Sequence, residues 1–187
     1  YRTKSIALTV GRQSIALVPG HIWLTKGLEL DVSAVKDEQL EITHKILGTH
    51  GDDPADVAKL RRVLDVNVVG LAATLAAFAP SMRAAKRGTL CGIASVAGIR
   101  GLPGAGAYSS SKAAAISWLE ALRVELRGSG VSVVTICPGY IDTPMTQVNR
   151  YRMPFLLSPD EGARRIPPAI DARRRLNSFG DPCRPWQ

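Results

Sequence analysis

The sequence predicts an α/β fold in which helices cover both faces of a parallel sheet. Strand-like runs alternate with helical stretches along the 187 residues, as they do in strand–helix–strand units. The run 131–137 is rich in β-branched residues, which is typical of a parallel strand buried on both faces. The run 88–98 indicates a second buried strand that ends in a turn of small residues. No internal repeat divides the chain, so we expect a single domain over residues 1–187.

The first of two long helices is predicted to begin at Asp53 and Pro54. An N-cap oxygen is followed there by a proline that needs no amide partner. Apolar residues then recur at helical spacing, and the helix continues past Asn67 to about Met82, in one piece or with a break. The stretch 71–78 is apolar nearly all round, which indicates a helix buried against the sheet and a neighbour.

The second long helix is predicted over about residues 107–126. Gly128 and Gly130 follow it, and glycine tolerates the left-handed conformation that often ends helices. Its flanks are apolar, so one side can cover the sheet. A second side could pack on another subunit or be buried entirely within the chain.

Composition excludes several classes of protein. Hydrophobic residues make up 45% of the chain, which excludes a disordered protein. Without an unbroken apolar run of about 18 residues, we expect no membrane span. The net charge is +8 and arginines accumulate late in the sequence. Such a tail could bind nucleic acid, but neither a recognised motif nor an aromatic platform accompanies it. A solvated helix face near 171–175 explains these arginines more simply, so no nucleic-acid partner is expected.

Cysteine and histidine spacing points to no metal site and no disulfide framework. The three cysteines are far apart, and Cys91 and Cys137 fall in predicted buried strands. They are most simply small core residues of a protein in a reducing compartment, so we expect a cytoplasmic location.

Three polar residues near the second helix indicate chemistry. Tyr108 and Lys112 are four residues apart, so in a helix they share one face. A tyrosine hydroxyl has a pKa near ~10, and a neighbouring ammonium is expected to lower it. Such a phenol can donate a proton to a carbonyl oxygen or accept one from an alcohol. Ser95, at the end of the upstream strand, would supply a second hydrogen bond to the same oxygen.

Taken alone, the Tyr-x-x-x-Lys pair is more often part of an ordinary surface helix, but its context is distinctive. Over residues 53–145 the chain resembles the short-chain dehydrogenase/reductase family. That family carries an Asn-Ser-Tyr-Lys tetrad and a Pro-Gly-x-x-x-Thr segment after a strand. The matching residues here are Asn67, Ser95, Tyr108, Lys112 and the segment from Pro138 to Thr143.

The resemblance implies a Rossmann-like doubly wound sheet and an NAD(P)-dependent oxidoreductase. The reaction would transfer hydride between the nicotinamide and a carbonyl or secondary alcohol. Tyr108 would act as general acid or base, and Lys112 would also hold the nicotinamide ribose. Ser95 would hydrogen-bond the reacting oxygen, and Asn67 would hold a water that joins Lys112 to a proton relay. An ordinary helix asparagine is the alternative for Asn67.

The segment after the 131–137 strand would contact the nicotinamide by the same resemblance. Thr143 and the Ile141 backbone would orient the carboxamide. Gly139, after Pro138, would permit close approach of the cofactor at the carboxyl end of the strand. A simple turn is the alternative for Pro138 and Gly139.

The start of the chain departs from the family. The glycine-rich turn that holds the cofactor pyrophosphate has no match, and neither has the family's Asn-Asn-Ala-Gly run. We align 5–12 with the second strand and 28–32 with the third, so the first strand and helix would be missing from the sequence. Arg12 would then meet a 2′-phosphate, which favours NADP(H) over NAD(H), and Asp31 would contact the adenine. A solvent-facing charge and a strand-end turn are the respective alternatives.

Further expectations concern the substrate and assembly. Residues 144–165 would form a lid, whose apolar side chains suggest an apolar or amphipathic substrate, although plain core packing explains them equally well. The two long helices would form a homodimer or homotetramer interface. A non-catalytic dinucleotide-binding or regulatory protein on the same scaffold is the rival function, because the glycine turn is missing.

Overall fold

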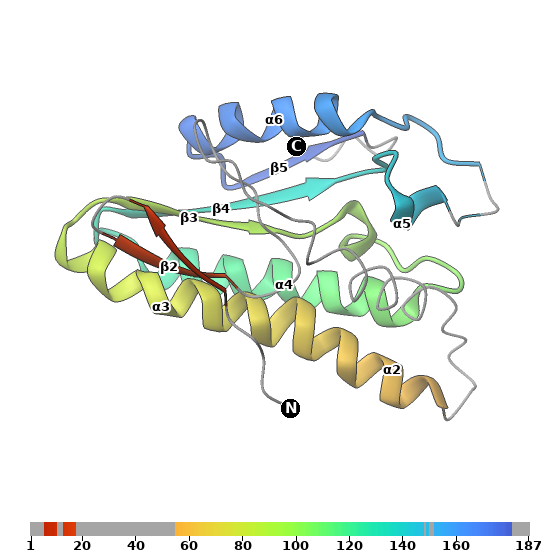
Figure 1. Cartoon of the computed structure of the whole chain (residues 1–187), viewed down its shortest axis with the longest axis horizontal. Helices are drawn as coiled ribbons and strands as arrows, with labels where there is room; N and C mark the ends of the chain where they lie inside the picture. The colour runs from red at the N-terminus through yellow and green to blue at the C-terminus, as the bar shows by residue number, and fades with distance from the viewer. Residues whose placement is uncertain (1–5, 11–12, 18–54, 148, 150–151, 181–187) are drawn as a thin grey trace.

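A three-stranded parallel sheet forms the centre of the molecule. The computed structural model describes residues 6–10, 13–17, 55–147, 149 and 152–180. The strands run in the order β3-β4-β5, with bounds Gly88–Ile93, Val131–Pro138 and Leu176–Phe179. Helices α3 and α4 lie on one face of this sheet and α6 lies on the other (Figure 1). The predicted parallel sheet with helices on both faces is therefore confirmed.

Strand β4 is the middle strand, and it separates two hydrophobic cores. Alternate side chains of a strand point to opposite faces. Accordingly, Val133 joins Leu90 and Leu119 in the core beneath α3 and α4. Val134 and Ile136 belong instead to the core beneath α6. The β-branched run thus fills both faces at once, which is why β4 is buried along most of its length.

The first long helix contains a π-helical turn in its middle. It consists of α2 (Ala55–Leu64), the π-turn η2 (Asp65–Val69) and α3 (Gly70–Ala84). Such turns widen the helix by one residue and are frequent at functional sites. The sequence left open whether this helix runs in one piece or with a break; the structure shows a continuous helical stretch with a π-turn, and Asn67 is the buried residue of that turn. Asp53 and Pro54 lie outside the described residues.

The second long helix, α4, spans Gly106–Glu125, within one residue of its predicted bounds. Ala115 and Leu119 on its inner face are fully buried. Gly92 of β3 makes this contact close, since a Cβ there would lie 2.4 Å from a Leu119 methyl carbon. Gly128 and Gly130 follow the helix with φ of +78° and +82°, conformations that side chains rarely adopt.

One strand prediction is wrong. Instead of entering the parallel sheet, β1 (Ile6–Val10) pairs antiparallel with β2 (Gln13–Leu17), and the two form a separate sheet. Only two residues separate the runs, and that length suits a hairpin better than a crossover to a parallel neighbour. Arg12, Asp31 and the predicted strand 28–32 lie outside the described residues.

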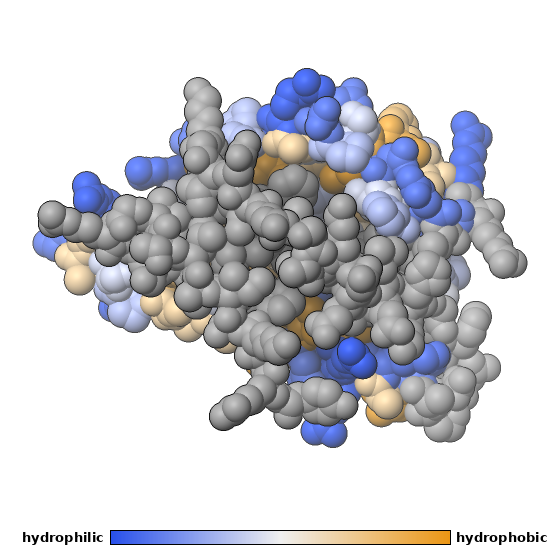
Figure 2. Space-filling view, in the orientation of Figure 1, coloured by the Kyte–Doolittle hydropathy of each residue, from blue (hydrophilic) through white to orange (hydrophobic). Residues whose placement is uncertain are grey.

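The end of the chain adds α6 (Pro159–Asp171) and β5, neither of which the sequence analysis placed. The helix face expected near 171–175 is wrong, because α6 ends at Asp171 and the following arginines lie in the turn before β5. Ser158 starts α6 with a capping box, because its hydroxyl accepts from the Glu161 amide and the Glu161 carboxylate accepts from the Ser158 amide. Hydrophilic side chains cover α6 along the top of Figure 2.

The predicted lid therefore needs a new boundary. Residues 144–165 begin with the short helix α5 (Pro144–Gln147) but end inside α6. Gly162 of α6 packs on Ile141, so closely that a Cβ there would lie 2.7 Å from an Ile141 carbon. Residues 159–165 thus belong to a helix packed on the sheet, because the capping box starts it at that point. The lid role of the residues before them stays a prediction.

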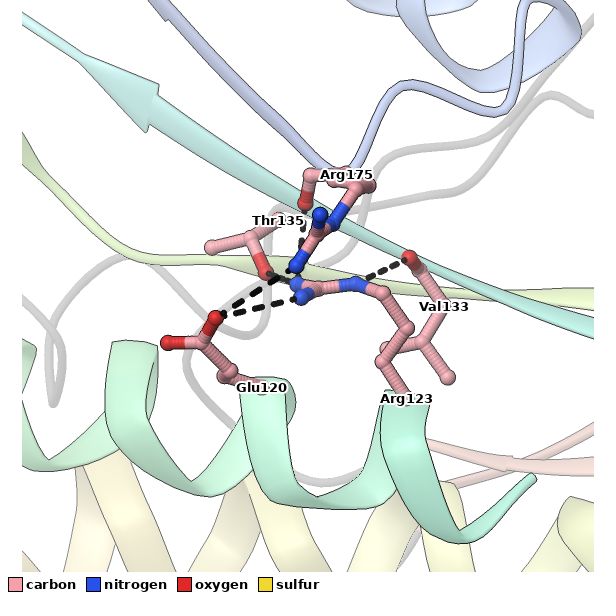
Figure 3. A network of polar contacts seen from close by, with 5 residues as sticks. All are labelled: Glu120, Arg123, Val133, Thr135 and Arg175. Carbon is pink, nitrogen blue, oxygen red and sulfur yellow. Dashed lines mark hydrogen bonds and ion pairs between the residues drawn. The ribbon is translucent and has the colours of Figure 1, made fainter. Parts of the chain in front are cut away.

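An arginine fastens α4 to the edge of the sheet. The Arg123 guanidinium donates to the Val133 carbonyl at 3.3 Å, the Thr135 hydroxyl at 3.3 Å and the Arg175 carbonyl at 3.0 Å (Figure 3). The Glu120 carboxylate lies 3.8 Å from the guanidinium. These bonds join α4, β4 and the residue before β5, so they hold the edge strand in place.

The stretch Asp56–Ala84 is long and apolar enough to cross a membrane, by length and composition alone. The sequence analysis expected no membrane span because no apolar run is unbroken, whereas this criterion averages hydropathy over a window and so tolerates residues such as Asn67 and Thr74. Core helices of soluble proteins meet the same criterion, and Val63 and Leu75 of this stretch are buried within the molecule. The absence of a membrane partner stays a prediction.

Candidate active site

The candidate catalytic side chains gather at the carboxyl end of the parallel sheet. Ser95 follows β3 by two residues, and Tyr108 and Lys112 lie in the first two turns of α4. Open α/β sheets bind their ligands at this edge, because the loops after the strands converge there. The fold therefore brings these three residues to the expected place.

Ser95 is held in extended backbone at the start of the short helix η3 (Val96–Gly98). Its hydroxyl accepts from the Ala97 amide at 3.1 Å and lies 3.5 Å from the Pro138 carbonyl. The Ser95 side chain also hydrogen-bonds the Tyr108 side chain. The hydroxyls of Ser95 and Tyr108, which come from different elements, therefore lie close enough together to donate hydrogen bonds to the same substrate oxygen.

The Tyr108 phenol has a raised pKa. Burial is the main cause, because a phenolate loses solvation in the protein. The Ser95 hydrogen bond acts in the opposite direction, and charge on Cys137 raises the pKa further. The predicted lowering by Lys112 is therefore wrong for this structure: burial outweighs the other effects. A raised pKa keeps the phenol protonated at neutral pH, as a proton donor must be.

Lys112 is almost completely buried, with 1% of its surface exposed. Its Nζ donates to the Ile93 carbonyl at 3.1 Å and lies 5.6 Å from the centre of the Tyr108 ring. Burial lowers the pKa of Lys112 to about 8, and charge on Cys137 opposes this shift. The amine can therefore gain and lose a proton within the physiological range.

Asn67 reaches the site from the π-turn. Its Nδ2 donates to the Ser111 hydroxyl at 3.0 Å, and that hydroxyl donates to the Tyr108 carbonyl at 2.7 Å. Both Asn67 and Ser111 are buried. The π-turn therefore places the amide against the same turn of α4 that carries Tyr108 and Lys112. The predicted relay water on Asn67 stays a prediction.

Gly139 has a packing role at the end of β4. A Cβ on Gly139 would lie 1.9 Å from the Gly180 carbonyl oxygen, and the Gly139 amide donates to the Phe179 carbonyl at 2.7 Å. The close approach of the segment after β5 is thus sufficient reason for a glycine. Contact of Pro138 or Gly139 with a cofactor stays a prediction.

The loop with Ile141 and Thr143 is fixed by Thr146, which the sequence analysis did not single out. The Thr146 hydroxyl donates to the Ile141 carbonyl at 2.6 Å and accepts from the Thr143 amide at 2.9 Å. Ile141 also forms a parallel bridge with Leu157. These contacts hold the loop to itself and to Leu157, at the position where the resemblance expects the carboxamide.

The hydrogen-bond donors gathered at this site have the chemistry needed to hold the nicotinamide half of a dinucleotide and a substrate oxygen. Ser95 and Tyr108 provide hydroxyls for a reacting oxygen, and Lys112 provides an ammonium beside them. Arg12 and Asp31, which were expected to contact the adenosine half, lie outside the described residues. Within the part of the chain that the structure describes, no three metal-ligating side chains cluster.

Cys137 lies closer to the chemistry than the sequence analysis expected. It is fully buried at the end of β4, as predicted for a core residue. It also lies near enough to influence the pKa values of both Tyr108 and Lys112. Its place directly before Pro138 was the available signal, since that position ends the strand beside the site.

Known proteins resemble this chain in sequence and in fold. A family model described as short chain dehydrogenase matches residues 46–153. An "Uncharacterized oxidoreductase" of Myxococcus xanthus is 43% identical over 129 residues, which cover 69% of this chain and 49% of that protein. The chain spans half or less of the length of the curated relatives that it matches.

Solved structures agree with this match. A short chain dehydrogenase from Burkholderia cenocepacia in complex with NADP has a TM-score of 0.60 and 27% identity, over 70% of this chain and 52% of that one. A 4-hydroxyisoleucine dehydrogenase mutant complexed with NADH and succinate has a TM-score of 0.57 and 26% identity, over 65% and 56%. These similarities support the Rossmann-like fold. Because the family model matches more than half of the chain, the protein belongs to the short-chain dehydrogenase family.

Proposed function

We propose that the protein is an NAD(P)-dependent oxidoreductase that transfers hydride between the nicotinamide and a carbonyl or secondary alcohol. The observation that carries the proposal is the meeting of Ser95, Tyr108 and Lys112 at the carboxyl end of the sheet. Membership of an oxidoreductase family supports it independently.

Tyr108 is the proposed proton donor in carbonyl reduction. Its raised pKa keeps the proton on the phenol until the substrate oxygen gains negative charge. Ser95 supplies the second hydrogen bond to that oxygen, where charge develops in the transition state. The nicotinamide, when bound, supplies or accepts the hydride. In the reverse direction Tyr108 accepts the alcohol proton.

Lys112 and Asn67 are the proposed supporting residues. Lys112 holds the ribose hydroxyls and, as an ammonium above the Tyr108 ring, favours transfer of the phenolic proton. Its pKa of about 8 suits a group that returns a proton to the tyrosine between turnovers. Asn67 extends this proton path through a water molecule. Ile141 and Thr143 orient the carboxamide.

We favour NADP(H) as the cofactor because Arg12 is basic where an acidic residue would favour NAD(H). The Burkholderia relative is in complex with NADP, whereas the 4-hydroxyisoleucine dehydrogenase is in complex with NADH. The preference therefore depends on Arg12 and on the alignment of 5–12 with the family's second strand, from which the β1–β2 hairpin departs.

An apolar or amphipathic substrate is proposed from the segment before α6. Phe155 and Leu156 are 61% and 42% exposed, although water disfavours such exposure. Phe155 holds a φ of +59°, which is strained for an aromatic residue. The bridge between Leu157 and Ile141 ties this segment to the loop of the site. The two apolar side chains could therefore cover a substrate.

We also propose a cytoplasmic homodimer or homotetramer. Val57, Val69 and Val124, on the two long helices, are 67%, 58% and 64% exposed, and a second subunit would bury them. The cytoplasmic location rests on Cys91 and Cys137, which are thiols rather than disulfide partners.

Cofactor titration of the full-length protein, followed by a carbonyl panel, tests the proposed function. Fluorescence titration with NADPH and NADH is expected to show tighter binding of NADPH. Ketones and aldehydes of increasing apolar size are then supplied with the preferred cofactor, and at least one is expected to be reduced. Tight cofactor binding without turnover of any carbonyl would favour the non-catalytic rival. Binding of neither cofactor would contradict the proposal.

A further inference from the structure

The Ser111 side chain is held in place by burial and by hydrogen bonds on both sides of its hydroxyl. It is fully buried and lies directly before Lys112, one turn after Tyr108. Its hydroxyl donates to the Tyr108 carbonyl at 2.7 Å, a common arrangement for a serine inside a helix. A hydroxyl has one hydrogen, so this bond uses the only proton that Ser111 can donate.

The orientation of the Asn67 amide follows from this proton count. With its hydrogen given to Tyr108, the Ser111 oxygen can only accept a bond from Asn67, 3.0 Å away. The Asn67 NH₂ group must therefore face Ser111, and its carbonyl oxygen must point away from Ser111. The flip of a buried amide is often ambiguous, but here its partner decides it.

Ser110 shows that the bond to Asn67 does not follow from helical geometry alone. Its hydroxyl makes a similar bond, to the Ala107 carbonyl at 3.1 Å, but its side chain is exposed. Of the two serines, Ser111 is the one that bonds a residue of the π-turn. The π-turn and the first turns of α4 are therefore joined by one hydroxyl that belongs to the Tyr-x-x-x-Lys segment itself.

We propose that Ser111 is a positioning residue of this site, which acts by holding the Asn67 amide in one orientation beside Tyr108 and Lys112. The inference rests on the proposed function. Removal of the hydroxyl would leave a buried NH₂ without its acceptor, and the amide would turn to find another. Proton delivery to the tyrosine would slow, while substrate binding would be unaffected. We expect kcat to fall roughly tenfold at unchanged KM, since small misplacements at a site cost up to about 100-fold.

The test compares Ser111→Ala with Ser110→Ala in the full-length protein, with each change also placed in an Asn67→Ala background. Ser111→Ala is expected to lower kcat roughly tenfold alone, and less than about twofold when Asn67 is already absent. Ser110→Ala is expected to leave kcat unchanged in both backgrounds. If Ser111→Ala does not fold, Ser111→Cys serves instead, because it keeps the shape and weakens the hydrogen bond.

Two outcomes would overturn the role of Ser111. One is a kcat of Ser111→Ala equal to that of the unaltered protein. The other is an equal loss with and without Asn67, which would mean that Ser111 only stabilises the helix. Failure of the proposed function differs from both, because the unaltered protein would then reduce no carbonyl at all. In that case the exchange rate of the Asn67 amide protons still reports on the bond: equal rates in Ser111→Ala and the unaltered protein would overturn the inference.

Discussion

Replacing Gly98 with alanine is expected to slow turnover, because a methyl group there would push Ser95 away from Tyr108. Gly98 ends η3, the short helix that Ser95 caps, and packs against the backbone of α4. A Cβ at this position would lie 2.6 Å from the Lys112 carbonyl carbon and 2.8 Å from the Ala113 nitrogen. Both neighbours are backbone atoms, so no rotamer change can relieve the clash.

The size of the effect follows from these distances. Carbon atoms in contact lie about 3.5–4.0 Å apart, so η3 must move by roughly 1 Å. Overpacking of this kind costs about 1–3 kcal/mol of unfolding free energy. Since Ser95 is joined to η3, the same shift lengthens its bond to Tyr108. A displacement of about 1 Å at a catalytic group can cost up to about 100-fold, so we expect kcat/KM to fall about 10- to 100-fold.

Gly101→Ala is the matched control. It lies three residues away, and a Cβ there would meet no atom within 4 Å. Urea denaturation and steady-state turnover should show losses for Gly98→Ala and none for Gly101→Ala. A Gly98→Ala protein with unaltered stability and unaltered turnover would refute the argument that η3 sets the distance between Ser95 and Tyr108.

Two further predictions concern the cationic side chains of Lys112, which is buried, and Arg123, which is partly exposed. Burial lowers the pKa of Lys112 to about 8 in the folded protein, so above that pH the unfolded chain binds more protons at this residue than the folded chain does. The free energy of unfolding should therefore rise with pH from about pH 8, and Lys112→Met should remove that rise. An unchanged pH profile of unfolding in the variant would contradict this prediction. Arg123→Met removes three hydrogen bonds at the sheet edge (Figure 3) and should lower the free energy of unfolding by roughly 1–3 kcal/mol without changing kcat. Arg127→Met, at an exposed position just after α4, should change neither, and equal losses in the two variants would count against the network.

The elements that form the site could be predicted because their signals are local. The β-branched run 131–137 predicts a buried strand from its own composition, without information from the rest of the chain. The glycines after residue 126 specify the end of α4 in the same way. Ser95, Tyr108 and Lys112 follow from chain order and helical spacing, and the structure brings their side chains together.

What the sequence analysis did not predict depends on contacts between residues far apart in the chain, or on burial, and residue spacing reveals neither. The run 5–12 suits a hairpin strand and a parallel strand equally, and pairing alone decides between them. The packing of Gly139 against Gly180, 41 residues later in the sequence, could not be read from spacing, and the contact of Gly139 with a cofactor stays a prediction. The Tyr108 pKa depends on burial, which a four-residue motif cannot specify. By contrast, Ser158 and Glu161 form a capping box that could have been read from the sequence.

Single-turnover oxidation of bound NADPH by Tyr108→Phe tests the central claim most directly. The variant keeps the ring and loses only the hydroxyl, so it should bind the cofactor with unaltered affinity. Because general acid catalysis contributes about 10²–10⁴-fold, the rate of hydride transfer to a carbonyl should fall by at least about 100-fold. Hydride transfer at the rate of the unaltered protein would show that the proton comes from another group, and the assignment of Tyr108 would be wrong.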